Sequence, residues 1–174
     1  MIHKNFINLC LTLLAVCWSV VVQAQSLSVD GIDYSLDKND MIATVTGPKA
    51  YSGHLVIPKK VVYEGEEYKV TRIGDYAFNE CSSLTSVEIP SSVTDIGNDA
   101  FEDCSSLASV NIPSSVTAIG YKAFSGCSCL TSVNIPSSVT YIGGSAFYEC
   151  SRLASIEIPS SVTSIAERVF AECI

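Results

Sequence analysis

A 23-residue sequence that occurs four times and begins a fifth time constrains the fold of this chain more than any other feature. The stretch IGDYAFNECSSLTSVEIPSSVTD at 73–95 returns with few changes at 96, 119 and 142, and starts again at 165. A period of this length is typical of a solenoid, in which successive coils stack along one axis. Catalysis needs a few unlike groups at one point, so a repeated unit favours an extended surface over an active site.

Apolar residues occupy the same positions in every unit, which predicts one continuous core. Alternation over 84–89 predicts a short strand that Pro90 ends, and a second extended piece follows at 93–96. The spacing of the inward positions in 99–104 predicts one or two helical turns. One unit has no second layer of its own, so stacked units must supply it. The first unit's core positions are Ile73, Ala77, Phe78, Cys81, Leu84, Val87, Ile89 and Val93.

The shared pattern of the units is Ile-Gly-x-x-Ala-Phe-x-x-Cys-Ser-x-Leu-x-Ser-Val-x-Ile-Pro-Ser-Ser-Val-Thr. It resembles the BspA-type leucine-rich repeat of bacterial surface proteins. The resemblance covers residues 73–174, as four full units and an incomplete fifth. It implies a repeat solenoid of the leucine-rich class, α/β with short strands and one-to-two-turn helices.

The segment before the repeats resembles the lead-in of such proteins. Its alternating residues are broken by Gly and Pro turns, which predicts β structure. The stretch Leu55-Val56-Ile57-Pro58 already imitates the strand of a repeat. We therefore expect a β-rich N-terminal cap over 25–72 that covers the first coil.

Residues 1–24 have the features of a secretory signal peptide. Lys4 precedes an uncharged run, and the small residue Ala24 ends a sequence suited to cleavage. A membrane anchor is the alternative, since a run of about 17 apolar residues is at the short limit of spanning length. A lipoprotein site at Cys17 is a further alternative, although Val16 is large for it. Cleavage after Ala24 predicts a secreted or cell-surface protein with no membrane insertion.

The charge of the chain excludes two classes of partner. Without residues 1–24 the chain has nine basic and 18 acidic residues, a net charge of −9. Residues 73–174 hold three of the basic and eleven of the acidic residues. Nucleic acids and anionic lipids are bound by clustered Lys and Arg, so we expect neither as a partner. Solubility outside the cell is the simplest reason for the acidity.

No catalytic or metal-binding motif emerges from the sequence. His54 is the one histidine after residue 24, and we expect it to be a surface turn residue rather than a general base. Asp99, Glu102 and Asp103 form an acidic patch, for which a solvated face is a simpler account than weak calcium binding. We therefore expect no enzyme and no cofactor.

The cysteines raise the question of disulfides. Stacked coils would place like cysteines about 5 Å apart, which a disulfide allows, and secretion favours oxidation. Five members cannot all pair, and cysteine also serves as a small buried hydrophobe, so we expect buried thiols. Cys129 replaces polar residues of the other units and is the candidate reactive thiol. The column consists of Cys81, Cys104, Cys127, Cys150 and Cys173.

The resemblance implies a binding function, because proteins of this family are associated with adhesion to host matrix proteins and to other bacteria. We expect a protein ligand, such as a component of the host extracellular matrix. The alternative is a structural spacer or assembly unit of the cell envelope with no ligand. The candidate binding face consists of the outward strand positions Ser86, Glu88, Ser109, Asn111, Ser132, Asn134, Ser155 and Glu157.

The incomplete fifth unit predicts a further interaction. Residues 165–174 begin a coil and stop before its strand. An uncapped coil leaves apolar side chains and strand groups open to water. We therefore expect end-to-end self-association, most simply as a two-fold dimer.

Overall fold

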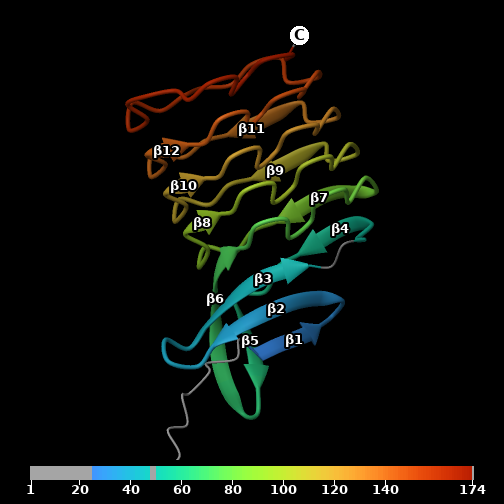
Figure 1. Ribbon diagram of the computed structural model, residues 1–174, viewed down its shortest axis with the longest axis vertical. Coiled ribbons are helices and arrows are strands. Elements are labelled where there is room, and N and C mark those ends of the chain that lie inside the picture. The colour runs from blue at the N-terminus through green and yellow to red at the C-terminus, as the bar shows by residue number, and fades with distance from the viewer. Residues whose placement is uncertain (1–24, 48–49, 174) are drawn as a thin grey trace, which may run out of the picture.

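The computed structural model describes residues 25–47 and 50–173, which form a β-solenoid with a strand-rich N-terminal part at one end (Figure 1). The predicted repeat solenoid is confirmed. The predicted signal peptide at 1–24 lies outside the described residues. The N-terminal strands are β1 (Gln25–Val29), β2 (Ile32–Asp37), β3 (Ile42–Gly47), β4 (Gly53–Val56), β5 (Lys60–Tyr63) and β6 (Glu66–Ile73). The later strands are β7 (Leu84–Glu88), β8 (Asp95–Ile96), β9 (Ser109–Asn111), β10 (Ala118–Ile119), β11 (Ser132–Asn134) and β12 (Tyr141–Ile142).

The N-terminal part is built from hairpins whose turns are visible in the sequence. Strands β1, β2 and β3 form an antiparallel meander, and β5 pairs antiparallel with β6. Asp30 and Gly31 between β1 and β2 both have positive φ, 52° and 78°, and so do Glu64 and Gly65 between β5 and β6. Two successive residues of this kind make the turn that best fits the twist of a two-residue hairpin.

Two sheets run along the solenoid, and each of the first three repeat units adds one strand to both (Figure 1). The larger sheet has the order β1-β2-β3-β6-β8-β10-β12, with β5 attached to β6. The four-stranded sheet has the order β11-β9-β7-β4 and is parallel throughout. The register places Val87 opposite Val110 and Val110 opposite Val133, so like residues form columns.

The N-terminal part and the repeats share strands. Strand β4 lies next to β7 in the four-stranded sheet, and β6 pairs with both β3 and β8. The predicted boundary between residues 72 and 73 therefore falls within β6. The division of the chain into a cap and a repeat domain stays a prediction.

The predicted helical turns are wrong, since the described residues contain no helix. The segment 75–80 is a series of turns in which Tyr76 and Glu80 have φ of 59° and 60°. These conformations point alternate N–H groups along the solenoid axis. Tyr76 N donates to Asn98 O at 2.9 Å, and Phe78 N donates to Ala100 O at 2.8 Å. A helix would direct these N–H groups into its own coil and would leave the adjoining coils without this third ladder.

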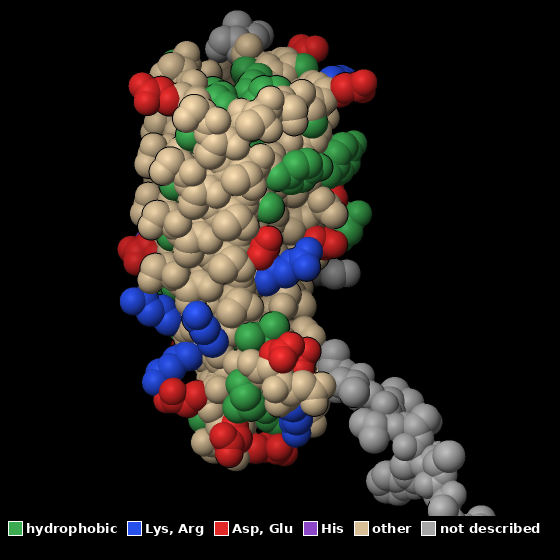
Figure 2. Space-filling view, turned by 90° about the vertical axis from the view of Figure 1, so that its left-hand side faces the viewer, with side chains coloured by type: hydrophobic (Ala, Val, Ile, Leu, Met, Phe, Trp, Pro, Cys, Tyr) green, Lys and Arg blue, Asp and Glu red, His purple; other side chains and the backbone are tan. Residues whose placement is uncertain are grey.

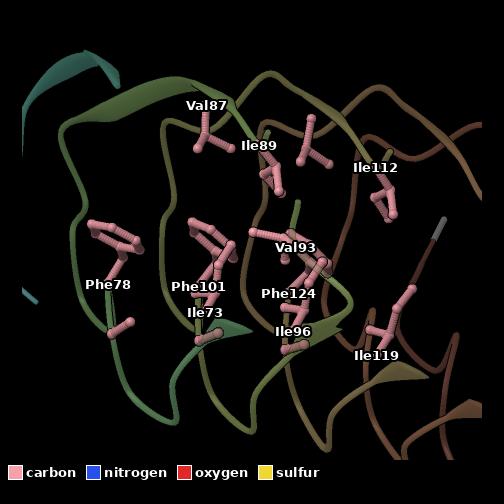
Figure 3. Packing of buried hydrophobic residues seen from close by; sticks show 14 of the residues in the cluster. Ile73, Phe78, Val87, Ile89, Val93, Ile96, Phe101, Ile112, Ile119 and Phe124 are labelled. Carbon is pink, nitrogen blue, oxygen red and sulfur yellow. The ribbon is translucent and has the colours of Figure 1, made fainter. Parts of the chain in front are cut away.

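Stacked phenylalanine side chains fill the centre of each coil (Figure 3). Phe78, Phe101, Phe124 and Phe147 are 0% exposed, and the last ring of the column, Phe170, is half-buried. Ring centroids lie 5.3 to 5.8 Å apart, close to the spacing of neighbouring strands. Burying one such side chain contributes about 1.5 to 3 kcal/mol, so the column is a large part of the stability of the array.

Candidate binding face

The structure brings six of the eight residues of the candidate binding face together on the outward side of the four-stranded sheet. Ser86 lies opposite Ser109, and Ser109 lies opposite Ser132. The neighbouring row is formed in the same register by Glu88, Asn111 and Asn134. Ser86 is half-buried and the other seven predicted residues are exposed. Ser155 and Glu157 continue the series in the fourth unit, where no strand is formed.

His54 belongs to this face, and the sequence-based interpretation of it as a turn residue is wrong. It lies in β4 directly opposite Ser86. Its Nδ1 is 2.7 Å from Ser86 Oγ, and its Nε2 is 3.3 Å from Glu88 Oε1. The signal for this position was present, because Leu55-Val56-Ile57-Pro58 aligns with Val87-Glu88-Ile89-Pro90 and places His54 beside Ser86.

The Ser86, His54 and Glu88 trio has the connectivity of a hydrolytic triad but a setting that suits binding better. The side chains of His54 and Glu88 are 50% and 68% exposed, so water screens their interaction. Hydrolytic triads need N–H groups aimed at the oxyanion of the reaction. Strand β7 lies between β4 and β9, and its backbone amides pair with these two strands. They are therefore engaged in the sheet and do not point at a bound oxyanion. We therefore interpret the trio as a hydrogen-bonded network that fixes polar groups on the face.

The face has the chemistry of a hydrogen-bonding surface. Serine hydroxyls form one row, and amides and carboxylates form the next. Hydroxyls and amides both donate and accept hydrogen bonds, whereas carboxylates only accept at neutral pH. Such a surface pairs with the donors and acceptors of another macromolecule.

The cysteine column has a structural role that its sequence pattern did not reveal. The six cysteines of the described residues are thiols and not disulfides. Burial raises the pKa of Cys104 and of Cys150 to about 12, and it raises that of Cys127 as well. Each thiol from the second unit onward donates to a phenylalanine carbonyl of the preceding coil. These pairs are Cys104–Phe78, Cys127–Phe101 and Cys150–Phe124 at 3.2 Å and Cys173–Phe147 at 3.0 Å.

Cys129 is half-buried and lies outside this column. It follows Cys127 and Ser128 in the turn before Leu130, which is fully buried. The equivalent Arg152 of the next unit is exposed. The reactivity of Cys129 stays a prediction.

The acidic patch around Asp99 is arranged around a lysine. Lys122 Nζ is 2.8 Å from Glu102 Oε1, and their side chains are 34% and 17% exposed. Burial is the main cause that raises the pKa of Asp99 and of Asp103, and the nearby Glu102 carboxylate adds to it. Within residues 25–47 and 50–173, no group of three or more His, Cys, Asp or Glu is placed to hold a metal ion.

The fold and this face define a repeat solenoid of the leucine-rich class, a scaffold that presents side chains on its sheet surfaces. Residues 65–174 match the sequence model described as the BspA type leucine rich repeat region, six copies. The chain therefore belongs to the BspA-type leucine-rich repeat family, and the predicted resemblance is confirmed. No curated protein matches the chain.

Solved structures of bacterial leucine-rich repeat proteins are similar to the chain. A protein from Bacteroides ovatus has 33% identity and a TM-score of 0.70 over 84% of this chain and 45% of its own. One from Bacteroides capillosus has 32% identity and a TM-score of 0.68 over 75% of this chain and 96% of its own. A leucine rich cell surface protein from Faecalibacterium prausnitzii has 32% identity and a TM-score of 0.67, over 84% of this chain and 46% of its own.

The repeats of the chain are of the type found in these bacterial proteins, one of which is described as a cell surface protein. The chain spans less than half the length of the proteins from Bacteroides ovatus and Faecalibacterium prausnitzii. The described part of the chain contains no helix of the length and hydropathy that crossing a membrane requires.

Proposed function

We propose that this protein is a secreted or cell-surface adhesion module that binds a protein ligand through the candidate binding face extended by His54. The observation that carries the proposal is the register of the four-stranded sheet, which aligns polar side chains of β7, β9 and β11 in two rows and adds His54 of β4 to the first row. Parallel pairing fixes the spacing of these groups at about 4.8 Å per coil, so the partner meets a preformed surface.

The ligand class that this face favours is a protein of the extracellular matrix or of a neighbouring cell. Support comes from membership of the BspA-type leucine-rich repeat family, from the likeness to a leucine rich cell surface protein, and from the net charge of −9 after residue 24, which disfavours nucleic acid and anionic lipid. Secretion through a signal peptide at 1–24 is part of the same proposal. End-to-end self-association stays a prediction.

The test compares adhesion of three proteins to a panel of purified matrix proteins, such as collagen, laminin and fibronectin. The first is the protein that begins at residue 25. The second is a face variant with serine at the four positions Glu88, Asn111, Asn134 and Glu157. The third is a matched control with serine at four exposed positions on other surfaces, Thr94, Thr117, Thr140 and Thr163.

We expect the parent and the control to bind one or more of these proteins, and the face variant to lose at least about tenfold in affinity, since removing hydrogen bonds to charged groups is costly. Equal binding by all three would place the partner elsewhere on the molecule. No binding by the parent to any matrix protein would favour the alternative, a structural spacer of the cell envelope.

A further inference from the structure

A pocket of about 450 Å³ lies where the N-terminal part meets the first coil of the repeats. Figure 2 shows Lys and Arg side chains gathered around this junction. Its volume lies in the range of small-molecule sites. We call it the basic pocket, and it is lined by Met41, Lys59, Lys60, Glu67, Lys69, Ser91 and Ser92.

The pocket results from a break in the repeat pattern. In later units the second serine of the Pro-Ser-Ser turn donates to the coil beneath it, as Ser115 Oγ does to Val93 O at 2.6 Å and Ser138 Oγ to Val116 O at 2.7 Å. Beneath the first such turn lie Pro58, Lys59 and Lys60, which follow β4 and take the place of a Pro-Ser-Ser turn. Ser92 Oγ instead lies 3.4 Å from Lys59 O, at the entry to the β5–β6 hairpin. After Pro58 and Lys59 the chain enters the β5–β6 hairpin, whereas the later units continue into β8, β10 and β12.

Backbone hydrogen bonds fix the lysines around this space. Lys59 O also accepts from Val70 N at 2.9 Å, and Lys69 N donates to Met41 O at 2.9 Å. Lys60 and Lys69 are direct partners in the antiparallel pair of β5 and β6. Their side chains therefore leave the same face of the hairpin, and like charges placed directly opposite each other destabilise a sheet.

Only part of this positive charge is neutralised within the described residues. Lys60 forms an ion pair with Glu67. Neither Lys59 nor Lys69 forms an ion pair within residues 25–47 and 50–173. Three lysines and one glutamate give the pocket a net charge of +2. Uncompensated cations are unexpected here, because acidic residues outnumber basic ones two to one after residue 24.

We propose that the basic pocket is a second binding site, distinct from the candidate binding face, for a small organic dianion. The net charge of +2 selects the charge of the ligand, and the lysine ammonium groups are donors suited to carboxylate or phosphate oxygens. The Ser91 hydroxyl offers a neutral partner, and Met41 offers an apolar contact. A dicarboxylate and a phosphate ester share this chemistry.

Titration calorimetry at constant low ionic strength tests the proposal with succinate and glycerol 3-phosphate as dianions and acetate as the monoanion. We expect at least one dianion to bind saturably and at least about tenfold more tightly than acetate. The variant Lys59→Gln with Lys69→Gln should lose at least about tenfold in affinity for that dianion. The control Lys38→Gln with Arg152→Gln removes the same charge elsewhere and should stay within about twofold.

Three results would overturn the proposal: no saturable binding of either dianion, equal binding of acetate, or an equal loss in the control, which would indicate non-specific screening. The single variant Lys69→Gln provides a check that needs no ligand. It removes the like charge opposite Lys60, so its melting temperature without ligand should equal or exceed that of the parent. A lower melting temperature would mean that Lys69 serves the fold instead of a ligand.

Discussion

Replacing Phe124 with alanine removes the central ring of the phenylalanine column and should destabilise the whole array. The side chain is 0% exposed and is stacked on Phe101 at 5.3 Å and on Phe147 at 5.4 Å. Emptying a buried aromatic site costs about 3 to 5 kcal/mol. Three hydrogen-bond ladders hold the coils at a fixed spacing, so the cavity cannot collapse and the cost should lie in the upper part of this range.

The assay is equilibrium unfolding in urea, followed by circular dichroism, together with thermal melting. A loss of 3 to 5 kcal/mol corresponds to a fall of about 6 to 20 °C for a domain of this size. Phe170→Ala is the matched control, because Phe170 is half-buried and stacks on one ring at 5.8 Å. We expect it to cost less than about 2 kcal/mol. If Phe124→Ala melts within a degree or two of the parent, or if the two variants lose the same free energy of unfolding, the phenylalanine column does not stabilise the array in this way.

Three further predictions concern thiols and carboxylates. In a short iodoacetamide pulse Cys129 should label first and Cys127 last, as peptide mass mapping would show; equal labelling would contradict this. Gly126→Asp should have a lower free energy of unfolding than Gly126→Asn in low salt, because the aspartate puts a second carboxylate beside Asp103. High salt screens this repulsion and should reduce the difference in free energy between the two variants. Burial raises the pKa of Asp99 and Asp103, so the native state holds these protons more tightly than the unfolded state, and the contribution of these two carboxyls to the free energy of unfolding should fall as pH rises above about 4. In urea titrations at several pH values, Asp103→Asn should weaken the dependence of the free energy of unfolding on pH. An unchanged dependence would contradict the raised pKa of Asp103.

The columns of the core were predictable from the sequence because a strict period leaves one way to stack the units. Every unit places Phe and Leu at the same positions, and the structure buries them in register. The helical turns were not predictable in this way. Ala100, Phe101 and Cys104 point inward with spacings of three and four in either conformation. The hydrogen bonds that decide between a helix and the observed turns run to the next coil. The spacing of inward residues along the sequence carries no information about these bonds.

The part of the candidate binding face within the repeats was predictable from the sequence, whereas its extension by His54 before the repeats was not. The outward rows follow from the alternation of each strand, as for Ser109 and Asn111. His54 was missed because Gly53 beside it indicates a turn, whereas its partner in the sheet, Ser86, lies 32 residues further along the chain. The basic pocket was missed for a related reason, since it depends on the pairing of Lys60 with Lys69 and on a turn of the first coil.

The central claim is that the partner binds over the exposed side of the four-stranded sheet, and site-specific labelling tests it most directly. In a Cys129→Ser background, an environment-sensitive fluorophore is attached to a cysteine introduced at Ser109, on β9, or at Thr117, an exposed position outside that sheet. Each labelled protein is titrated with the matrix protein that binds the parent. We predict a saturable change in emission from position 109 and none from position 117. A response at 117 with none at 109 would contradict the claim.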